Sequence, residues 1–455
     1  IDAVAHMPPL WQKTFVDTIY DKQQVFAFGE WFLGADEYNE NYYEFSNQSG
    51  MSLLDFRLGQ EIRQTLRDFE DDFYGLWDVI QETEQEHNQV IDQVPFIDNH
   101  DMERFHKSDA DKKNVEIALS LLLTSRGVPT IYYGTEQYLT GGSDPNNRKP
   151  MPGFDQSTTA YNVISKLAPM RQQNPALAYG DTQQRWINSD VLFYEREFGD
   201  NAVLVGINRS SNWYTVDGLQ TALPPGTYGD ELDGILDGFS QTVNSDGSID
   251  TLDFGPKTVT VWAHNGDTTT PALGHVGPTM AQTSQTITLS GVGFGSSAGS
   301  VEFSGTRANP VSWSDTEIEV EVPYVEGGYY DITVTDADGN TSNAFTDFEI
   351  VSDDLVSVRF IINEAYTDTG ENVYLVGDQH ELGDWDSAAS VGPLFNQVCH
   401  EYPNWYYDVA VPAGRDIEFK FIKKDSNGNV TWESGDNRTF TTPSSGTGTY
   451  EGTWK

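Results

Sequence analysis

Three acidic residues near the start of the chain stand where short apolar runs end. Asp2 lies in the segment IDAVAH, Glu30 ends the segment VFAFGE, and Asp101 follows FIDNH. Acids that are distant in the sequence meet when parallel strand ends converge on one face of a barrel. Two carboxylates about 5 Å apart can act as nucleophile and acid/base on a glycosidic bond. Each acid alone is more often a helix cap or a surface residue, so the indication comes from the three together.

These acids need a scaffold of parallel strands, and the first 178 residues carry its pattern. Short β-rich runs at 25–28, 51–56, 94–97 and 128–133 are bounded by turn residues. Helical patterns lie between them, including an apolar stripe over residues 10–20 and an apolar helix core at 117–123. This alternation predicts a parallel sheet with covering helices.

Beyond about residue 180 the pattern becomes all-β, with short apolar runs separated by Gly, Asp and Asn. A Thr-rich, linker-like stretch at 265–271 and a second boundary near 352–354 divide this part of the chain. The sequence therefore predicts several all-β domains after the α/β part.

Charge and composition exclude several classes of protein. The 26 basic and 70 acidic residues give a net charge of −44, which would repel nucleic acid. No apolar run reaches about 18 residues, so no membrane span is expected. The chain has a single cysteine, Cys399, which excludes an intrachain disulfide. It has no Cys/His cluster of the kind that binds zinc, so a zinc site is not expected.

The acidic excess is spread along the chain, and such a surface stays soluble at high salt because self-repulsion is screened. This favours a halophilic protein, and an ordinary acidic secreted enzyme is the alternative.

Several motifs together resemble one family. The segments IDAVAHMP, FGEWFLG, MSLLDF, FIDNHDMERF and IYYGTEQY resemble the α-amylase superfamily, and specifically its cyclodextrin glucanotransferases. The resemblance continues through GHVGPTM and GFGSS to ELGDWD and YPNWYYDV, so it covers essentially the whole chain.

The resemblance implies a multidomain fold, a partial (β/α)8 TIM barrel followed by three all-β sandwich domains. Residues 1–178 would be the C-terminal part of the catalytic barrel and 179–268 a β-sandwich C domain. An immunoglobulin-like IPT/TIG D domain would occupy 269–352, and a family-20 starch-binding E domain 353–455.

The same resemblance assigns roles to the three acids. Asp2 would be the nucleophile that forms the glycosyl-enzyme, Glu30 the general acid/base, and Asp101 the transition-state stabiliser. Other residues are expected to bind sugar: His100 beside the stabiliser, Phe32 and Phe56 on the acceptor side, Asp144 and Arg148 on the donor side, and His6.

The family also binds structural calcium (Ca2+), mostly through ligands N-terminal to the motifs found here. The backbone carbonyl of His6 is the one calcium ligand expected in this chain. From the residues alone, the His6 side chain is expected either in the core or in the groove.

Two departures from the family pattern matter. The chain begins inside the nucleophile motif, and about five strand ends remain of an eight-stranded barrel. Five strands cannot close such a barrel, so we expect a fragment of a larger protein that is inactive alone. In addition, Ala5 stands where the family usually has a lysine that helps to hold the acceptor sugar.

Aromatic residues of the last domain are expected to bind starch. Trp385 and Trp432 stand in polar turns, which favours exposure, whereas Trp405 and Tyr407 are expected in the core. By the resemblance, two starch sites and one further maltose site follow: Trp385 and Trp432 with Lys420 and Asn437; Tyr402 with Thr367, Asn372, Asn396 and Gln397; and Trp186 in the C domain.

The function implied is that of a secreted, extracellular, monomeric transglycosylase. It would act on starch and maltooligosaccharides and make cyclodextrins by intramolecular transfer. Two alternatives remain: a maltogenic α-amylase of the same layout with water as acceptor, and an inactive starch-binding fragment. The GEWFLG segment and the two Phe positions favour the transferase, and Ala5 weakens it.

Overall fold

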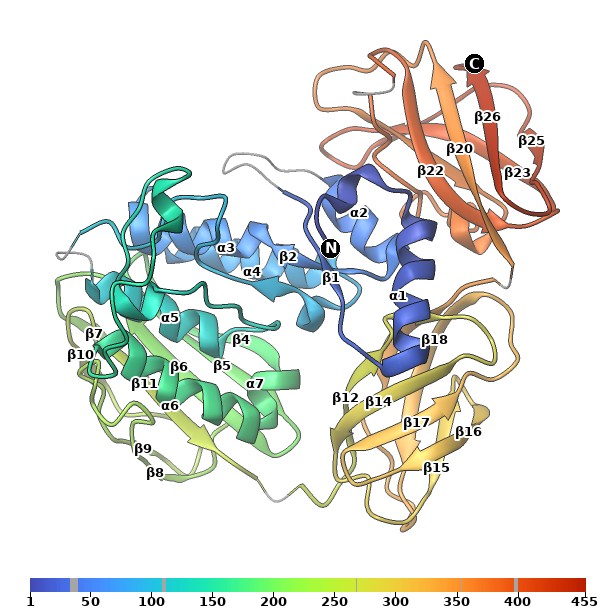
Figure 1. The fold of residues 1–455 in the computed structure, drawn as a ribbon. Coiled ribbons are helices and arrows are strands. Elements are labelled where there is room, and N and C mark those ends of the chain that lie inside the picture. The colour runs from blue at the N-terminus through green and yellow to red at the C-terminus, as the bar shows by residue number, and fades with distance from the viewer. Residues whose placement is uncertain (33–39, 109–111, 267, 353, 397–399) are drawn as a thin grey trace.

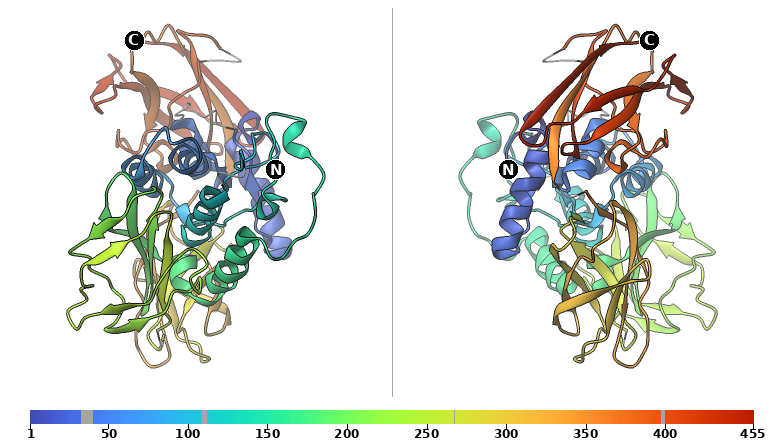
Figure 2. Two further views of the ribbon diagram at one scale, coloured as in Figure 1. Left: turned by 90° about the vertical axis from the view of Figure 1, so that its left-hand side faces the viewer. Right: turned by 90° about the vertical axis from the view of Figure 1, so that its right-hand side faces the viewer.

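The computed structural model describes residues 1–32, 40–108, 112–266, 268–352, 354–396 and 400–455. An α/β part comes first and is followed by three all-β regions (Figure 1), which we call the barrel part and the C, D and E domains. Two further views show the E domain at one end of the molecule and the C and D domains at the other (Figure 2). The expected fold class is therefore confirmed.

The barrel part is built on short parallel strands. Strands β1 (Phe28–Gly29), β2 (Ser52–Asp55) and β3 (Val94–Pro95) pair in that order, all parallel. Residues 1–4 continue the array beside β1, because Ile1 N donates to Phe28 O (2.8 Å) and Glu30 N donates to Ile1 O (2.8 Å). On the other side, a parallel bridge joins Phe96 to Thr130.

The expected strand bounds are only partly correct. The run at 25–28 has ladder partners only from Phe28 onward, while Val25 and Phe26 are 44% and 47% exposed. The run at 128–133 contributes one bridge at Thr130. These runs carry strand-forming residues, but few of their positions have a neighbouring strand to pair with.

Helices cover and connect this array, and local sequence signals start several of them. Asp55 caps α3 by accepting from Leu58 N (2.9 Å), and Asp72 and Thr158 cap α4 and α6 in the same way. The helices are α1 (Pro9–Gln23), α2 (Glu40–Ser49), α3 (Phe56–Arg63), α4 (Phe73–Glu86), α5 (Lys112–Thr124), α6 (Thr159–Gln173) and α7 (Pro175–Tyr179), with short helical turns η1 (Val4–His6), η2 (Gln64–Asp68), η3 (Val90–Asp92), η5 (Thr135–Gln137) and η6 (Asn146–Arg148).

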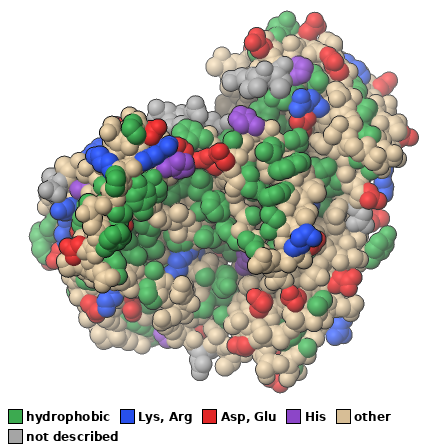
Figure 3. All heavy atoms as spheres, viewed as in Figure 1, with side chains coloured by type: hydrophobic (Ala, Val, Ile, Leu, Met, Phe, Trp, Pro, Cys, Tyr) green, Lys and Arg blue, Asp and Glu red, His purple; other side chains and the backbone are tan. Residues whose placement is uncertain are grey.

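The stripe over residues 10–20 does form a helix, but its aromatic residues are not its buried face. Trp11 and Phe15 are exposed and stack on each other with ring centroids 5.4 Å apart. Lys13 is buried instead and pairs with Asp17 at 2.7 Å. Figure 3 shows hydrophobic side chains gathered on the face that carries the N-terminal segment and α1.

The C domain centres on a four-stranded sheet in the order β11-β6-β5-β4, and two antiparallel pairs, β7 with β10 and β8 with β9, complete it. Its strands are β4 (Asp181–Ile187), β5 (Val191–Phe198), β6 (Asn201–Asn208), β7 (Tyr214–Val216), β8 (Gly226–Tyr228), β9 (Gln241–Val243), β10 (Leu252–Phe254) and β11 (Val259–His264).

The D domain has strands in the order β12-β14-β17-β16-β15-β18-β19-β13. They are β12 (Ala272–Gly277), β13 (Met280–Ala281), β14 (Thr286–Val292), β15 (Ser300–Phe303), β16 (Thr306–Trp313), β17 (Glu317–Glu321), β18 (Gly328–Thr335) and β19 (Phe345–Ile350).

The E domain has two sheets, β22-β20-β26 and β21-β23-β24, and β25 also pairs with β23. Its elements are β20 (Leu355–Asn363), β21 (Asn372–Gly377), η7 (His380–Leu382), β22 (Trp405–Pro412), β23 (Asp416–Lys424), β24 (Val430–Trp432), β25 (Arg438–Thr441) and β26 (Thr447–Thr453). As expected, Trp405 and Tyr407 are buried in its core.

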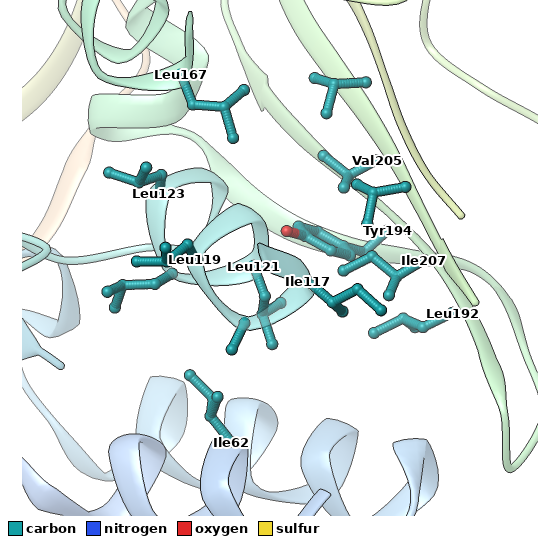
Figure 4. Packing of buried hydrophobic residues seen from close by; sticks show 14 of the residues in the cluster. Ile62, Ile117, Leu119, Leu121, Leu123, Leu167, Leu192, Tyr194, Val205 and Ile207 are labelled. Carbon is teal, nitrogen blue, oxygen red and sulfur yellow. The ribbon is translucent and has the colours of Figure 1, made fainter. Parts of the chain in front are cut away.

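The largest apolar core joins the barrel part to the C domain. Leu119 and Leu121 of α5 belong to one cluster with Leu192, Val205 and Ile207 of the C sheet (Figure 4). Burying apolar side chains on both sides of this contact excludes water and stabilises the two parts together. Among the described residues, no helix has the length and apolarity needed to cross a bilayer.

The E domain contacts both the barrel part and the D domain. Phe395 stacks on Trp31 with centroids 6.2 Å apart, and Asn41 donates to Pro393 O. Burial raises the pKa of Glu44 to about 8, and the nearby charge of Glu349 adds to this rise.

His380 of η7 forms the charged contact between the E and D domains. Its Nε2 lies 3.2 Å from Glu349 Oε1, and its ring packs edge-on against Tyr329 at 4.9 Å. Burial opposes the imidazolium, but the hydrogen bond and charge of Glu349, with smaller contributions from Glu381 and Asp384, raise the pKa of His380 above 6.5.

We predict that His380→Gln destabilises the chain at low pH and has less effect as pH rises. A raised folded-state pKa contributes stability that is full below about pH 6.5 and is lost as pH rises through the folded pKa. The loss should be about 1–2 kcal/mol at pH 5.5, as for hydrogen bonds to charged groups. Unfolding midpoints of both proteins between pH 5.5 and 9 measure it, with His264→Gln in the C sheet as control. A difference that is constant over this range would contradict the prediction.

Candidate active site

Asp2, Glu30 and Asp101 meet at the carboxyl ends of the parallel array. Asp2 lies in the segment that pairs with β1, and Glu30 directly follows β1. Asp101 lies in the loop after β3, beyond the bridge at Phe96. Parallel pairing sends all three chain segments to the same edge, as the sequence predicted.

Glu30 is the electrostatic centre of this group. Burial raises the pKa of its carboxyl, and a hydrogen bond with the Asp2 side chain raises it further. The charges of Asp101 and Asp2 also raise it, while His100 opposes them. One carboxylate oxygen of Glu30 is buried without a hydrogen-bond partner among the described residues. A carboxyl with a raised pKa keeps its proton and suits a general acid.

Asp101 is held in place by two basic side chains. Its Oδ1 accepts from Arg148 Nη2 at 2.8 Å, and its Oδ2 lies 3.1 Å from His100 Nε2. Arg148 also donates to His100 O (2.9 Å) and approaches Asp144 Oδ1 at 3.3 Å. The structure thus brings one predicted donor-side residue, Arg148, into direct contact with the predicted stabiliser, and the other, Asp144, into contact with Arg148.

The two predicted acceptor-side aromatics differ in exposure. Phe32 is 55% exposed, whereas Phe56 is fully buried and packs against Phe96 at 5.0 Å. Their rings meet edge-on at 5.1 Å. The expectation that Phe56 itself lines a sugar subsite is wrong for this structure, because its first position in α3 turns it into the core, where it supports Phe32.

His6 lies at the end of η1 and its side chain is exposed. Of the two positions expected from the sequence, in the core or in the groove, the core position is therefore wrong. Among the described residues there is no group of three or more His, Cys, Asp or Glu side chains that could hold a metal ion. The predicted carbonyl ligand of His6 therefore has no set of such side chains around it among the described residues. Ala5, beside it, offers no cation to an acceptor sugar.

The residues that fix the site loops were not found from the sequence. Arg104 and Asn147 are buried and tie the loop around residues 140–149 to the loop that carries Asp101. In the sequence, each is only a polar residue within a recognised motif. The carbonyl groups to which their side chains donate are 29 to 47 residues away along the chain.

The first predicted starch platform lies on one face of the β21-β23-β24 sheet. Trp432 is 43% exposed and lies opposite Ile422 in the β23–β24 ladder. Trp385 is half-buried and packs on a small apolar cluster formed by Tyr374, Val376 and Ile422. Lys420 Nζ donates to Gly435 O (2.7 Å) and Asn437 Nδ2 donates to Glu418 (2.9 Å), so both brace the turn beside Trp432.

The second predicted starch site surrounds exposed Tyr402. Its hydroxyl bonds the backbone of Thr367 (3.2 Å from Thr367 N), and its ring meets exposed Tyr366 at 6.2 Å. Tyr366 was missed, although an aromatic in the polar segment EAYTDTG was a usable signal. Asn372 begins β21 and Asn396 is half-buried, while Gln397 lies outside the described residues. Trp186 is only half-buried and packs on the C-domain core.

An acidic pair at parallel strand ends, a C-terminal β domain and an exposed Trp platform define an α-amylase-type carbohydrate-active protein. Family models agree over most of the chain: the alpha amylase catalytic domain at 7–152, the alpha amylase C-terminal all-beta domain at 186–265, the IPT/TIG domain at 271–350 and the starch binding domain at 355–451.

Individual relatives narrow the class. The cyclomaltodextrin glucanotransferase of Geobacillus stearothermophilus is 55% identical over 449 residues, covering 98% of this chain and 63% of that protein. The one from Niallia circulans is 53% identical over 459 residues, covering 100% and 64%. The crystal structure of the gamma-CGTase from alkalophilic Bacillus clarkii superposes with a TM-score of 0.85 at 49% identity, covering 100% of this chain and 68% of that one.

The chain belongs to the cyclomaltodextrin glucanotransferase family. It spans 63–64% of the length of these two curated relatives.

We predict that Asp2→Asn and Glu30→Gln each lower starch turnover by about 10²–10⁴-fold or more, because each removes a group that must exchange a bond or a proton. The assay uses an extended polypeptide in which this chain is completed to the length of its relatives. Starch binding should persist in both variants, and Asp21→Asn on α1 is the matched control. Near-normal turnover in either variant would remove that residue from the catalytic pair.

Proposed function

We propose that this chain carries the catalytic acids and starch-binding surfaces of a cyclodextrin-forming transglycosylase. The observation that carries the proposal is the contact of Asp2 with Glu30, in which burial and the hydrogen bond with Asp2 raise the pKa of the Glu30 carboxyl. The names of the relatives described above support cyclodextrin formation over the maltogenic alternative.

The mechanism is a double displacement with retention. The Asp2 carboxylate attacks the anomeric carbon while Glu30 gives its proton to the leaving glycosidic oxygen. The C–O bond breaks and an ester to Asp2 forms. A sugar hydroxyl then attacks the same carbon, its proton passes to Glu30, and the Asp2 ester is released. When that hydroxyl is the distant 4-OH of the bound chain, a ring forms.

Electrostatics fit this sequence of steps. The transition state carries positive charge on the sugar, and Asp101 places a third carboxylate beside the reacting pair. Arg148 and His100 hold Asp101 at 2.8 Å and 3.1 Å, so it is positioned before substrate binds. The exposed face of Phe32 is a stacking surface for an acceptor sugar.

Product analysis on soluble starch tests the proposal. The extended polypeptide should release cyclodextrins, and the 455-residue chain alone should release none, because among the described residues no further parallel segment pairs beyond residues 1–4 or beyond Thr130. Linear maltose as the main product would favour the maltogenic alternative, and turnover by the chain alone would contradict its expected inactivity.

Five finer features belong to the same proposal. The predicted domain boundaries, 1–178, 179–268, 269–352 and 353–455, are proposed as functional units. Structural calcium would need ligands beyond the residues described. Secretion, a monomeric state and an acidic surface adapted to high salt complete the proposal, and the −44 charge supports the last. The melting temperature as a function of KCl concentration tests the adaptation to high salt.

The platform residues give a prediction for the E domain by itself. Its core consists of its own residues, so residues 353–455 should fold alone. Trp385→Ala with Trp432→Ala should weaken granular-starch binding at least tenfold, because each stacking face contributes roughly 1–3 kcal/mol. Circular dichroism must show a native spectrum. Tyr402→Ala is the control, since it should affect a separate site; a folded double variant with full affinity would exclude the platform.

A further inference from the structure

The loop of residues 140–149 carries the donor-side residues Asp144 and Arg148 but has little structure of its own. Apart from the short turn η6 it forms no helix or strand, and most of its residues are exposed. Asn147 is its one fully buried residue. The position of Arg148 against Asp101 therefore depends on what anchors this loop.

Arg104 provides the anchor from the next segment of the barrel part. Its side chain is 0% exposed, its Nε donates to Asn147 O (2.8 Å), and its Nη1 donates to Tyr133 O (2.7 Å). Its backbone N donates to Gly141 O (2.9 Å). One residue thus joins the loop after β3, the segment after Thr130 and the two ends of the donor-side loop.

The guanidinium is also fixed in orientation. Its central carbon lies 4.0 Å from the centroid of the Tyr132 ring and 4.7 Å from that of Tyr133. The nearest carboxylate in contact, Asp98, is 3.8 Å away, beyond hydrogen-bond distance. A planar fork that stacks on aromatic faces and donates along set directions fits this place, and a lysine does not.

The contacts return from the loop to the catalytic segment. Asn147 Nδ2 donates to His100 O (2.7 Å) and Met102 O (3.0 Å), on both sides of Asp101. The next residue, Arg148, donates to Asp101 itself. Arg104 is therefore linked to the Asp101 carboxylate through the backbone of residues 147–148.

Stability alone explains this arrangement poorly. Nη2 of Arg104 is buried without a hydrogen-bond partner among the described residues. An incompletely paired buried cation costs free energy, so its retention calls for an explanation other than stability.

We propose that Arg104 is a positioning residue for the donor side of the site. It holds the loop of residues 140–149 so that Asp144 and Arg148 meet a long glucan and Arg148 meets Asp101. This inference rests on the proposed function, and Arg104 itself touches no substrate in it.

The test compares a long and a short donor in the extended polypeptide. Maltohexaose reaches the donor-side loop, whereas α-maltosyl fluoride occupies only the sugar positions next to the bond that breaks. Arg104→Met keeps much of the side-chain volume and removes every side-chain hydrogen-bond donor. It should raise KM for maltohexaose at least fivefold, change KM for α-maltosyl fluoride less than twofold, and lower kcat about tenfold for both because Asp101 loosens.

Arg104→Lys keeps the charge and is the second variant if Arg104→Met fails to fold; it should show the same KM split in weaker form. Arg196→Met is the matched control, since Arg196 is equally buried but donates to Gly180 O in the C domain. It should leave both KM values unchanged.

Unchanged KM for maltohexaose in the Arg104 variants, or an equal change in KM for both donors, would overturn the inference. A parent polypeptide that forms no cyclodextrin would instead overturn the proposed function, so the two failures are distinguishable.

Discussion

The parallel pairing of residues 1–4 with Phe28–Glu30 is the interaction on which the site depends. Three backbone hydrogen bonds, from Ile1, Glu30 and Val4, set the register of the two segments. In this register the Asp2 and Glu30 side chains reach one another. A shift by one residue would send them to opposite faces of the array and separate the pair.

Burial then determines how the acids differ. Glu30 is the most buried of the three carboxyl groups, and this burial raises its pKa; the hydrogen bond with Asp2 and the charges of Asp101 and Asp2 raise it further. Arg148 and His100 contact Asp101, and among the described residues no lysine or arginine pairs with Glu30. The difference between the carboxyl groups thus follows from their surroundings, since Glu30 is buried and Asp101 is paired with basic side chains. It does not follow from the residue types themselves.

The sequence predicted the elements that have local signals. Strand-like runs, helical stripes and the acids at strand ends were recognisable because each depends on neighbours in the chain. Phe56 was misplaced because its type suits both a sugar and a core, and only the packing against Phe96 decides. Arg104 and Asn147 were not recognised because their partners are main-chain atoms brought close by the fold. The exposed Trp11 shows the same limit, since periodicity alone does not tell which side of a helix finds a partner.

The apolar cluster that α5 shares with the C sheet bears on how such proteins can be recombined. Separating the chain near residue 178 would leave Leu192, Val205 and Ile207 facing water, so the C domain is inherited together with the barrel. The buried members of the main E-domain cluster all lie between Val356 and Phe421. Removing the E domain would uncover smaller contacts, such as those of Trp31 with Phe395 and of Glu349 with His380, but would not divide an apolar core. The E domain can therefore be exchanged between proteins at a smaller loss of buried apolar surface than the C domain, whose core is continuous with that of the barrel part.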